Sequence, residues 1–157
     1  MLDIKKANKI LDMILENEQF DGKIIIEHGE NFCYFKQENL NNFKIAISNN
    51  FNFKNFKKYI KSYLLNFLDF NIDNTEINDI YEVFGLLHEV GHIYTYDNWY
   101  KEERERCYSN YKNKKYNSEY SAFIDYRSIP MEYNCDIFAI NIIKKYKKEL
   151  LLIMNNN

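Results

Sequence analysis

The chain has 157 residues, of which 46% are hydrophobic and 28% are charged. These values are ordinary for one globular domain, which we expect to span residues 1–154, with 155–157 as a frayed tail. The net charge of −2 and the pI of about 6.0 predict no basic surface of the kind that binds nucleic acid. No apolar run is long enough to span a membrane, so neither nucleic acid nor a membrane is an expected partner.

The N-terminus and the cysteines predict a cytoplasmic location. Charged residues interrupt the first 20 residues, which leaves no continuous apolar segment of the kind found in signal peptides. Cys33, Cys107 and Cys135 are odd in number and show no C-x-x-C spacing. We therefore expect reduced thiols, without a disulfide framework or a thiolate zinc site.

The first half of the chain predicts a helix followed by three strands and a second helix. Residues 2–17 repeat apolar side chains at helical spacing. The segment 21–36 is typical of two strands joined by a turn at 28–30, and 43–48 alternates like a half-buried strand. A second helix is expected within 53–70. The predicted fold class is α+β, with a few-stranded, mostly antiparallel sheet.

Two longer helices are predicted in the second half. The first begins after a cap at Asn74 or Thr75 and continues to about residue 96. Its expected buried stripe consists of Ile77, Ile80, Phe84 and Leu87. The second extends from about Pro130 to residue 148, with proline in the first turn. Its apolar side carries Ile140, Ile143 and Leu150.

The stretch "HEVGH" on the first of these helices indicates a metal site. Side chains four residues apart in a helix lie on one side, so His88 and His92 can reach a single ion. Glu89 is rotated away from them and can meet water held by the metal, as in H-E-x-x-H zinc hydrolases. The alternative is two core histidines that share a helix. Gly91 costs about 1 kcal/mol relative to alanine in mid-helix, which indicates close approach by another backbone.

A third ligand is required, because catalytic zinc takes three protein ligands and leaves one position open. Glu132 and Asp136 are also four residues apart, on the apolar side of the last helix, where unpaired carboxylates are costly. We predict Glu132 as the third ligand and Asp136 as the hydrogen-bond acceptor for the outer ring nitrogen of a zinc histidine. The alternative is two acids stabilised by the helix dipole and by solvent. Cys135 is a further, less favoured ligand.

Together, "HEVGHI" and "YRSIPMEYNCDIFAINII" resemble the ImmA/IrrE-type zinc metallopeptidases. In that family H-E-x-G-H is followed by a tyrosine, a proline and E-x-x-A-[DN]-x-[FW]-A, and the matching residues here are Tyr126, Pro130, Glu132, Asp136, Phe138 and Ala139. Cys135 departs from the pattern, since the family usually has alanine there. The 39 residues between His92 and Glu132 exceed the expected spacing, which predicts an inserted lid or an altered cleft. The resemblance covers roughly residues 80–145 and implies a small zincin-like fold, with the H-E-x-x-H helix against the sheet.

The expected function is zinc-dependent hydrolysis of a peptide bond, with Glu89 as general base. The resemblance implies a specific protein target, commonly a DNA-binding repressor. A substrate strand is expected to add to the sheet along 43–48. The alternatives are a zinc-bound regulatory or binding module that cleaves nothing, and a zinc amidase that acts on a non-peptide substrate. The sequence does not predict the oligomeric state.

A donor for the oxyanion is also expected in a zincin site. Tyr96 and Tyr126 are the leading candidates, and Tyr94, Arg127 and His28 are alternatives. The competing interpretation is that the tyrosines are exposed or only pack, and that His28 is solvated. Eight of the 14 tyrosines lie within 94–126. Either they form an aromatic lid over the cleft, or they pack a long connection. The run "KEERER" at 101–106 is typical of a solvated helix face.

Overall fold

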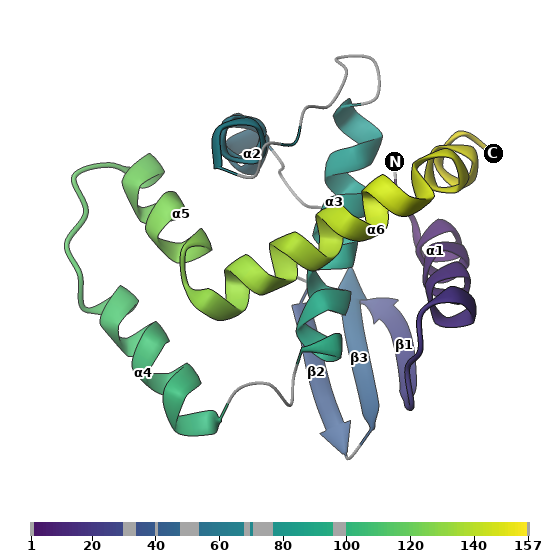
Figure 1. Ribbon diagram of the computed structural model, residues 1–157, viewed down its shortest axis with the longest axis horizontal. Helices are drawn as coiled ribbons and strands as arrows, with labels where there is room; N and C mark the ends of the chain where they lie inside the picture. Colours follow the sequence, from purple (N-terminus) through teal and green to yellow (C-terminus); the bar gives the residue numbers. More distant parts are fainter. Residues whose placement is uncertain are drawn as a thin grey trace.

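The structure is a computed structural model that describes residues 2–29, 34–39, 41–47, 54–67, 70, 77–95 and 100–156. Within these ranges the fold is α+β, as predicted, and it is mostly helical (Figure 1). The elements in chain order are α1 (Ile4–Asn17), β1 (Lys23–His28), β2 (Tyr34–Asn39), β3 (Asn42–Ile47), α2 (Lys54–Phe67), α3 (Ile77–Tyr94), α4 (Lys101–Lys112), α5 (Glu119–Arg127) and α6 (Pro130–Asn155). None of the helices described is both long and apolar enough to cross a membrane.

The sheet is mixed rather than mostly antiparallel, which corrects the expectation from the sequence. The strand order is β1-β3-β2, so the central β3 pairs in parallel with β1 and antiparallel with β2. The turn predicted at 28–30 does not make a hairpin of β1 and β2, because His28 ends β1 and aligns with Ile47 of β3. Alternating apolar residues define which face of a strand is buried, but they do not define its neighbour.

The hairpin of the sheet lies instead between β2 and β3. Asn41, directly before β3, has a φ of 63°, in the left-handed region that tight hairpin turns require and asparagine tolerates. In β3, Phe43 and Ile45 are buried, as the alternation predicted, and Ala46 is buried as well. β3 is therefore covered more completely than a half-buried strand.

α3 occupies the middle of the molecule, with α6 crossing it on one side and the sheet on the other (Figure 1). Three residues of its predicted stripe, Ile80, Phe84 and Leu87, are buried. The side chain of Ile77 and the predicted caps at 74 and 75 lie outside the described residues. The helix is also buried at positions off the stripe, such as Val83. This burial on nearly all sides makes α3 the central element that other parts of the chain cover.

α6 continues beyond its predicted end at residue 148. It is interrupted at Tyr146, whose φ of −118° and ψ of 26° are not helical, and then continues to Asn155. This bend returns Leu150 and Met154 to the core, which explains the extra turns. Of the tail predicted to fray, Asn155 is thus helical, Asn156 is exposed and residue 157 lies outside the described part.

Candidate metal centre

The backbones of α3 and α6 meet at Gly91. A Cβ atom at this position would lie 3.0 Å from the Cα atom of Cys135 and 3.1 Å from its carbonyl oxygen. The close approach predicted from a mid-helix glycine is therefore confirmed, and α6 is the partner. Cys135 is itself buried, so a small side chain fits this crossing. Because Cys135 lies between Glu132 and Asp136, the crossing sets both carboxylates opposite the histidines.

Three side chains from the two helices converge on one point. The Nε2 atoms of His88 and His92 are 3.1 Å apart. His88 Nε2 lies 3.1 Å from Glu132 Oε2, and His92 Nε2 lies 3.6 Å from Glu132 Oε1. Nitrogen and oxygen ligands at about 2.0–2.1 Å from a tetrahedral ion are separated by roughly 3.3–3.4 Å. The spacing therefore fits a single metal ion, and this group could hold one.

Asp136 lies behind His88, away from the point of convergence. Its Oδ1 atom is 2.9 Å from His88 Nδ1, and its Oδ2 atom accepts a hydrogen bond from the Tyr63 hydroxyl at 2.8 Å. In a neutral imidazole, donation from Nδ1 to Asp136 leaves the lone pair on Nε2. That lone pair faces His92 Nε2 and the Glu132 carboxylate, both of which can also act as acceptors. A cation between the three atoms satisfies them together.

Arg127, at the end of α5, completes the buried network. Its guanidinium donates to Asp136 Oδ1 and lies 3.9 Å from Glu132 Oε2. It also stacks over the rings of Tyr63 and Phe84, and its Nε atom has no hydrogen-bond partner. The sequence had suggested Arg127 only as an alternative oxyanion donor. An arginine in the last turn of a short helix looks like a solvated cation at the negative helix end, so no local pattern distinguishes it.

The formal charges around the site favour a divalent cation. Glu89, Glu132 and Asp136 contribute three carboxylates, and Arg127 contributes one guanidinium. When both histidines are neutral, as metal ligands must be, these four groups carry a charge of −2, in a region where Glu132 and Asp136 are almost fully buried. Buried charges are stable only when they are paired or bound to a metal. An ion of charge +2 would balance the set.

Burial and neighbouring charges also shift the pKa values of His88, Glu132 and Glu89. Burial and the Arg127 charge act to lower the pKa of His88, but hydrogen bonds to Asp136 and Glu132 outweigh them and raise it to about 9. Burial opposes ionisation of Glu132, yet hydrogen bonds and charges from both histidines hold its pKa well below the usual value. Burial raises the pKa of Glu89, against the opposing charges of His88 and His92. Glu89 thus lies near the histidines but does not join the three converging ligands.

Of the two tyrosines singled out from the sequence, one is placed by the structure beside the site. Burial raises the pKa of Tyr126, and the charge of Glu132 and a hydrogen bond to it add to this effect. Tyr96 lies outside the described residues. Tyr94 points away, since its hydroxyl donates to the carbonyl of Glu18 at 3.4 Å. His28 is exposed at the end of β1.

Tyr108 is a site residue that the sequence reasoning missed. It projects from α4, and its hydroxyl donates a hydrogen bond to Glu132 Oε1. Its ring and that of Tyr111 both pack near Tyr126, with centroid separations of 6.4 and 5.4 Å. The only signal was the tyrosine-rich segment 94–126, which did not identify one residue. Part of this segment therefore reaches the site, through Tyr108 and Tyr126.

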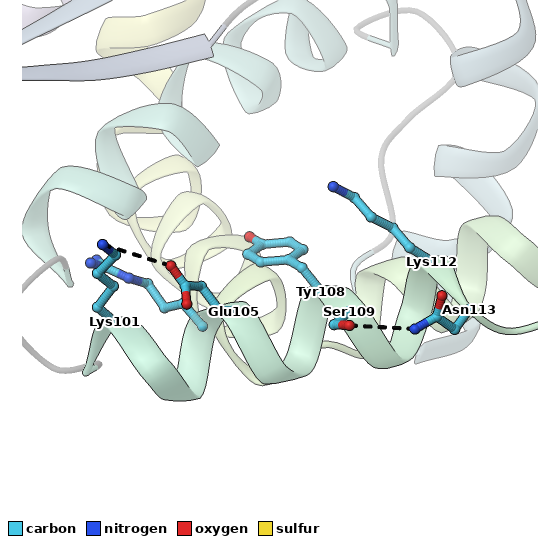
Figure 2. A pocket seen from close by; sticks show the side chains of 7 residues that line it. Lys101, Glu105, Tyr108, Ser109, Lys112 and Asn113 are labelled. Carbon is cyan, nitrogen blue, oxygen red and sulfur yellow. Dashed lines mark hydrogen bonds and ion pairs between the residues drawn. The ribbon is translucent and has the colours of Figure 1, made fainter.

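A pocket opens beside Tyr108 on α4 (Figure 2). Its volume is about 590 Å³, and the described residues that line it belong to one face of α4 and to Asn113 just beyond it. Ser109 and Asn113 are hydrogen-bonded to each other there at 3.4 Å. Tyr108 is thus the residue that lines this pocket and also contacts Glu132.

Comparison with family models, with curated proteins and with solved structures finds no match to this chain. The resemblance to the ImmA/IrrE-type metallopeptidases therefore remains a prediction based on the motif residues alone.

Proposed function

We propose that this chain is a zinc-dependent metallopeptidase of the ImmA/IrrE type. The observation that supports this most directly is the convergence of His88, His92 and Glu132, with ligand atoms 3.1–3.6 Å apart. Glu89 follows the first histidine, as the H-E-x-x-H chemistry requires. α3 lies against the sheet, which agrees with a zincin-like fold.

Zinc is the metal that this donor set favours. Two imidazole nitrogens and one carboxylate are the ligands of several catalytic zinc sites, which leave a fourth position open. Calcium and magnesium prefer sites built from oxygen ligands alone. The contact between Asp136 and His88 Nδ1 is also typical of zinc histidines, because it orients the ring and increases its basicity.

The residues of the chain have separate tasks in the proposed reaction. When bound, zinc supplies a Lewis acid that polarises the peptide carbonyl and acidifies water. Glu89 takes the proton of the attacking water and then delivers it to the leaving amine. Tyr108 and Tyr126 are hydrogen-bonded to Glu132, and either hydroxyl would donate to the oxyanion after turning from Glu132 to the substrate.

The sequence had suggested that a substrate strand adds to the sheet along 43–48. This prediction is wrong, because β3 is paired on both sides. Among the described strands, the edges are β1 and β2. α1 packs against β1, whereas β2 lies against α3 and on the side of the sheet towards α4 (Figure 1). We therefore assign the substrate to the edge of β2, where backbone hydrogen bonds can hold an extended peptide.

The proposed substrate is a peptide bond in a specific protein. The family resemblance suggests a transcriptional repressor as that protein, cleaved in the cytoplasm. Direct binding of nucleic acid by this chain is not part of the proposal, because its net charge is −2.

Metal analysis and one conservative variant test the proposal. Purified protein is expected to hold about one zinc ion per chain, and the double variant His88→Ala/His92→Ala to hold almost none. Glu89→Gln should fold, retain zinc and lose at least about 100-fold in the rate of peptide cleavage. Full zinc retention by the double variant would refute the metal site. A biological effect that survives in Glu89→Gln would favour the regulatory module instead.

A further inference from the structure

Tyr63 on α2 contacts the side of the candidate metal centre that faces away from the ligands. Its side chain is only 2% exposed, and its hydroxyl donates a hydrogen bond to Asp136 Oδ2 at 2.8 Å. Ile60 and Leu64, on the same face of α2, are buried as well. Tyr63 itself has no task in the proposed reaction, so its buried polar contact needs an explanation of its own.

Two groups of α5 hold the ring of Tyr63 in place. The ring of Phe123 meets it edge-on, with the centroids 5.8 Å apart and the planes at 89°. The guanidinium of Arg127 lies over it at 5.8 Å from the centroid. A ring packed in this way restricts the position of its hydroxyl, so the hydrogen bond to Asp136 has a defined direction.

The Asp136 carboxylate is contacted at both of its oxygens. His88 Nδ1 lies 2.9 Å from Oδ1, and the guanidinium of Arg127 donates to the same oxygen. The hydroxyl of Tyr63 donates to Oδ2. The terminal torsion of an aspartate is broad, so contacts at one oxygen alone leave the carboxylate plane free to turn. A donor at the second oxygen fixes that plane, and with it the direction from which Oδ1 meets the imidazole.

We propose that Tyr63 is a positioning residue of the metal centre, which fixes the Asp136 carboxylate and through it the ring of His88. This inference rests on the metal site of the proposed function and adds α2 to the elements that build it. Partners of metal-bound histidines influence the metal through the ring that they orient, and Tyr63 acts one hydrogen bond further away. The alternative is a hydroxyl that only satisfies a buried carboxylate oxygen and stabilises the fold.

Tyr59 offers a matched control on the same helix. It lies about one turn before Tyr63, and its ring is also 5.8 Å from that of Phe123. Its hydroxyl likewise donates to a carboxylate, Glu119 Oε2, at 3.2 Å. Glu119 begins α5, whereas Arg127 ends it beside the centre. Tyr63→Phe and Tyr59→Phe therefore remove the same chemical group, at the centre and away from it.

Zinc affinity can be measured by competition with a chromophoric chelator. We expect Tyr63→Phe to lower the affinity by roughly three- to tenfold, less than Asp136→Ala does, and Tyr59→Phe to leave it unchanged. In the Asp136→Ala background Tyr63→Phe should have no further effect, because the carboxylate on which it acts is gone. A loss that persists in full without Asp136 would overturn the positioning role.

The imidazole of His88 reports the same effect independently of cleavage. Its Nδ1-bound proton is followed by NMR in protein with ¹⁵N-labelled histidine, both zinc-loaded and metal-free. Tyr63→Phe should move this proton to higher field and speed its exchange with water, because a carboxylate that can turn accepts a longer hydrogen bond. An unchanged proton together with a lower urea midpoint would mean that the hydroxyl only stabilises the fold.

The results distinguish this inference from the proposed function. Equal zinc affinity in wild type and folded Tyr63→Phe would refute the positioning role and leave the metal site intact. Absence of zinc binding by the wild-type protein would refute the metal site, and this inference with it. If Tyr63→Phe does not fold, wild-type protein with ¹³C-labelled tyrosine decides. The hydroxyl proton of Tyr63 should then be visible, and its loss to fast exchange would overturn the inference.

Discussion

Asp136 contacts the ring nitrogen of His88 that faces away from Glu132: Oδ1 and Nδ1 are 2.9 Å apart. The other nitrogen, Nε2, lies 3.1 Å from Glu132. The two carboxylates of α6 thus hold opposite sides of one imidazole. Asp136 fixes the ring orientation and the tautomer, and Glu132 shares the point at which the ion is proposed to bind.

Asp136→Ala is expected to weaken zinc affinity by about 10–100-fold, because the imidazole loses the acceptor that orients it and makes it more basic. A competition titration with a chromophoric zinc chelator measures the change. Asp136→Asn keeps the size and can still accept the hydrogen bond, so its loss should fall at the low end of that range. Wild-type zinc affinity in a folded Asp136→Ala protein would contradict the assignment.

Gly91→Ala should destabilise the protein even though alanine favours helices. The added Cβ would lie 3.0 Å from Cys135 Cα, and backbone atoms cannot move aside as a flexible side chain can. We expect the free energy of unfolding to fall by about 1–3 kcal/mol, measured by urea denaturation. Zinc affinity should fall as well, because separating α3 from α6 moves Glu132 away from the histidines. The control is Asn134→Ala at an exposed position of α6, which should not destabilise the protein. Increased stability of Gly91→Ala would show that the helices do not pack as described.

The residues that could be predicted from sequence are those whose arrangement depends on a single helix. The i, i+4 spacing sets His88 beside His92, and Glu132 beside Asp136, before any tertiary structure is known. Gly91 also predicted one tertiary contact. A glycine in mid-helix lowers the stability of the helix, and close approach by another backbone explains why it is present. Most of the site residues that could be predicted from the sequence therefore lie on α3 and α6.

The strand order and the contacts of Arg127 and Tyr108 could not be predicted, because they depend on how segments far apart in the sequence pack against each other. The parallel pairing of β1 with β3 places β2 at an edge, and no alternation within a strand determines this. Arg127 is buried only because α5 ends against Asp136, and Tyr108 reaches Glu132 only because α4 turns that face inwards. Both residues look like ordinary surface positions in their local sequence.

Lowering the pH should weaken the contact between Glu18, the residue directly after α1, and α6. Glu18 accepts hydrogen bonds from Lys145 at 2.7 Å and from Tyr146 at 2.8 Å. The hydrogen bond from Lys145 outweighs burial, and with Tyr146 and the lysine charge it lowers the pKa of Glu18 below its usual value of 4.5. A carboxyl whose pKa is lower in the folded state stabilises the protein above the unfolded pKa, and this contribution disappears as pH falls through the folded pKa.

Wild-type protein should therefore have a higher urea midpoint than Glu18→Gln at pH 7, and the difference should vanish as pH falls below 4.5. Glu16→Gln, at an exposed position in the last turn of α1, is the control and should change the stability at pH 7 by less than about 0.5 kcal/mol. A difference between wild type and Glu18→Gln that persists unchanged in acid would contradict the ionic contribution.

Arg127→Met tests the charge balance of the buried network. The substitution keeps much of the side-chain length but leaves Asp136 and Glu132 without their guanidinium, and removing one member of a buried ion pair costs about 3–5 kcal/mol. We expect a loss of this size in urea denaturation with a chelator present. Excess zinc should reduce the difference from wild type, because a divalent cation compensates the same carboxylates and binds more tightly once a nearby positive charge is gone. Arg106→Met, at a side chain that is 71% exposed, should change the stability by less than about 0.5 kcal/mol in either condition. An equal loss in Arg127→Met with and without zinc would mean that Arg127 and the metal do not compensate the same carboxylates.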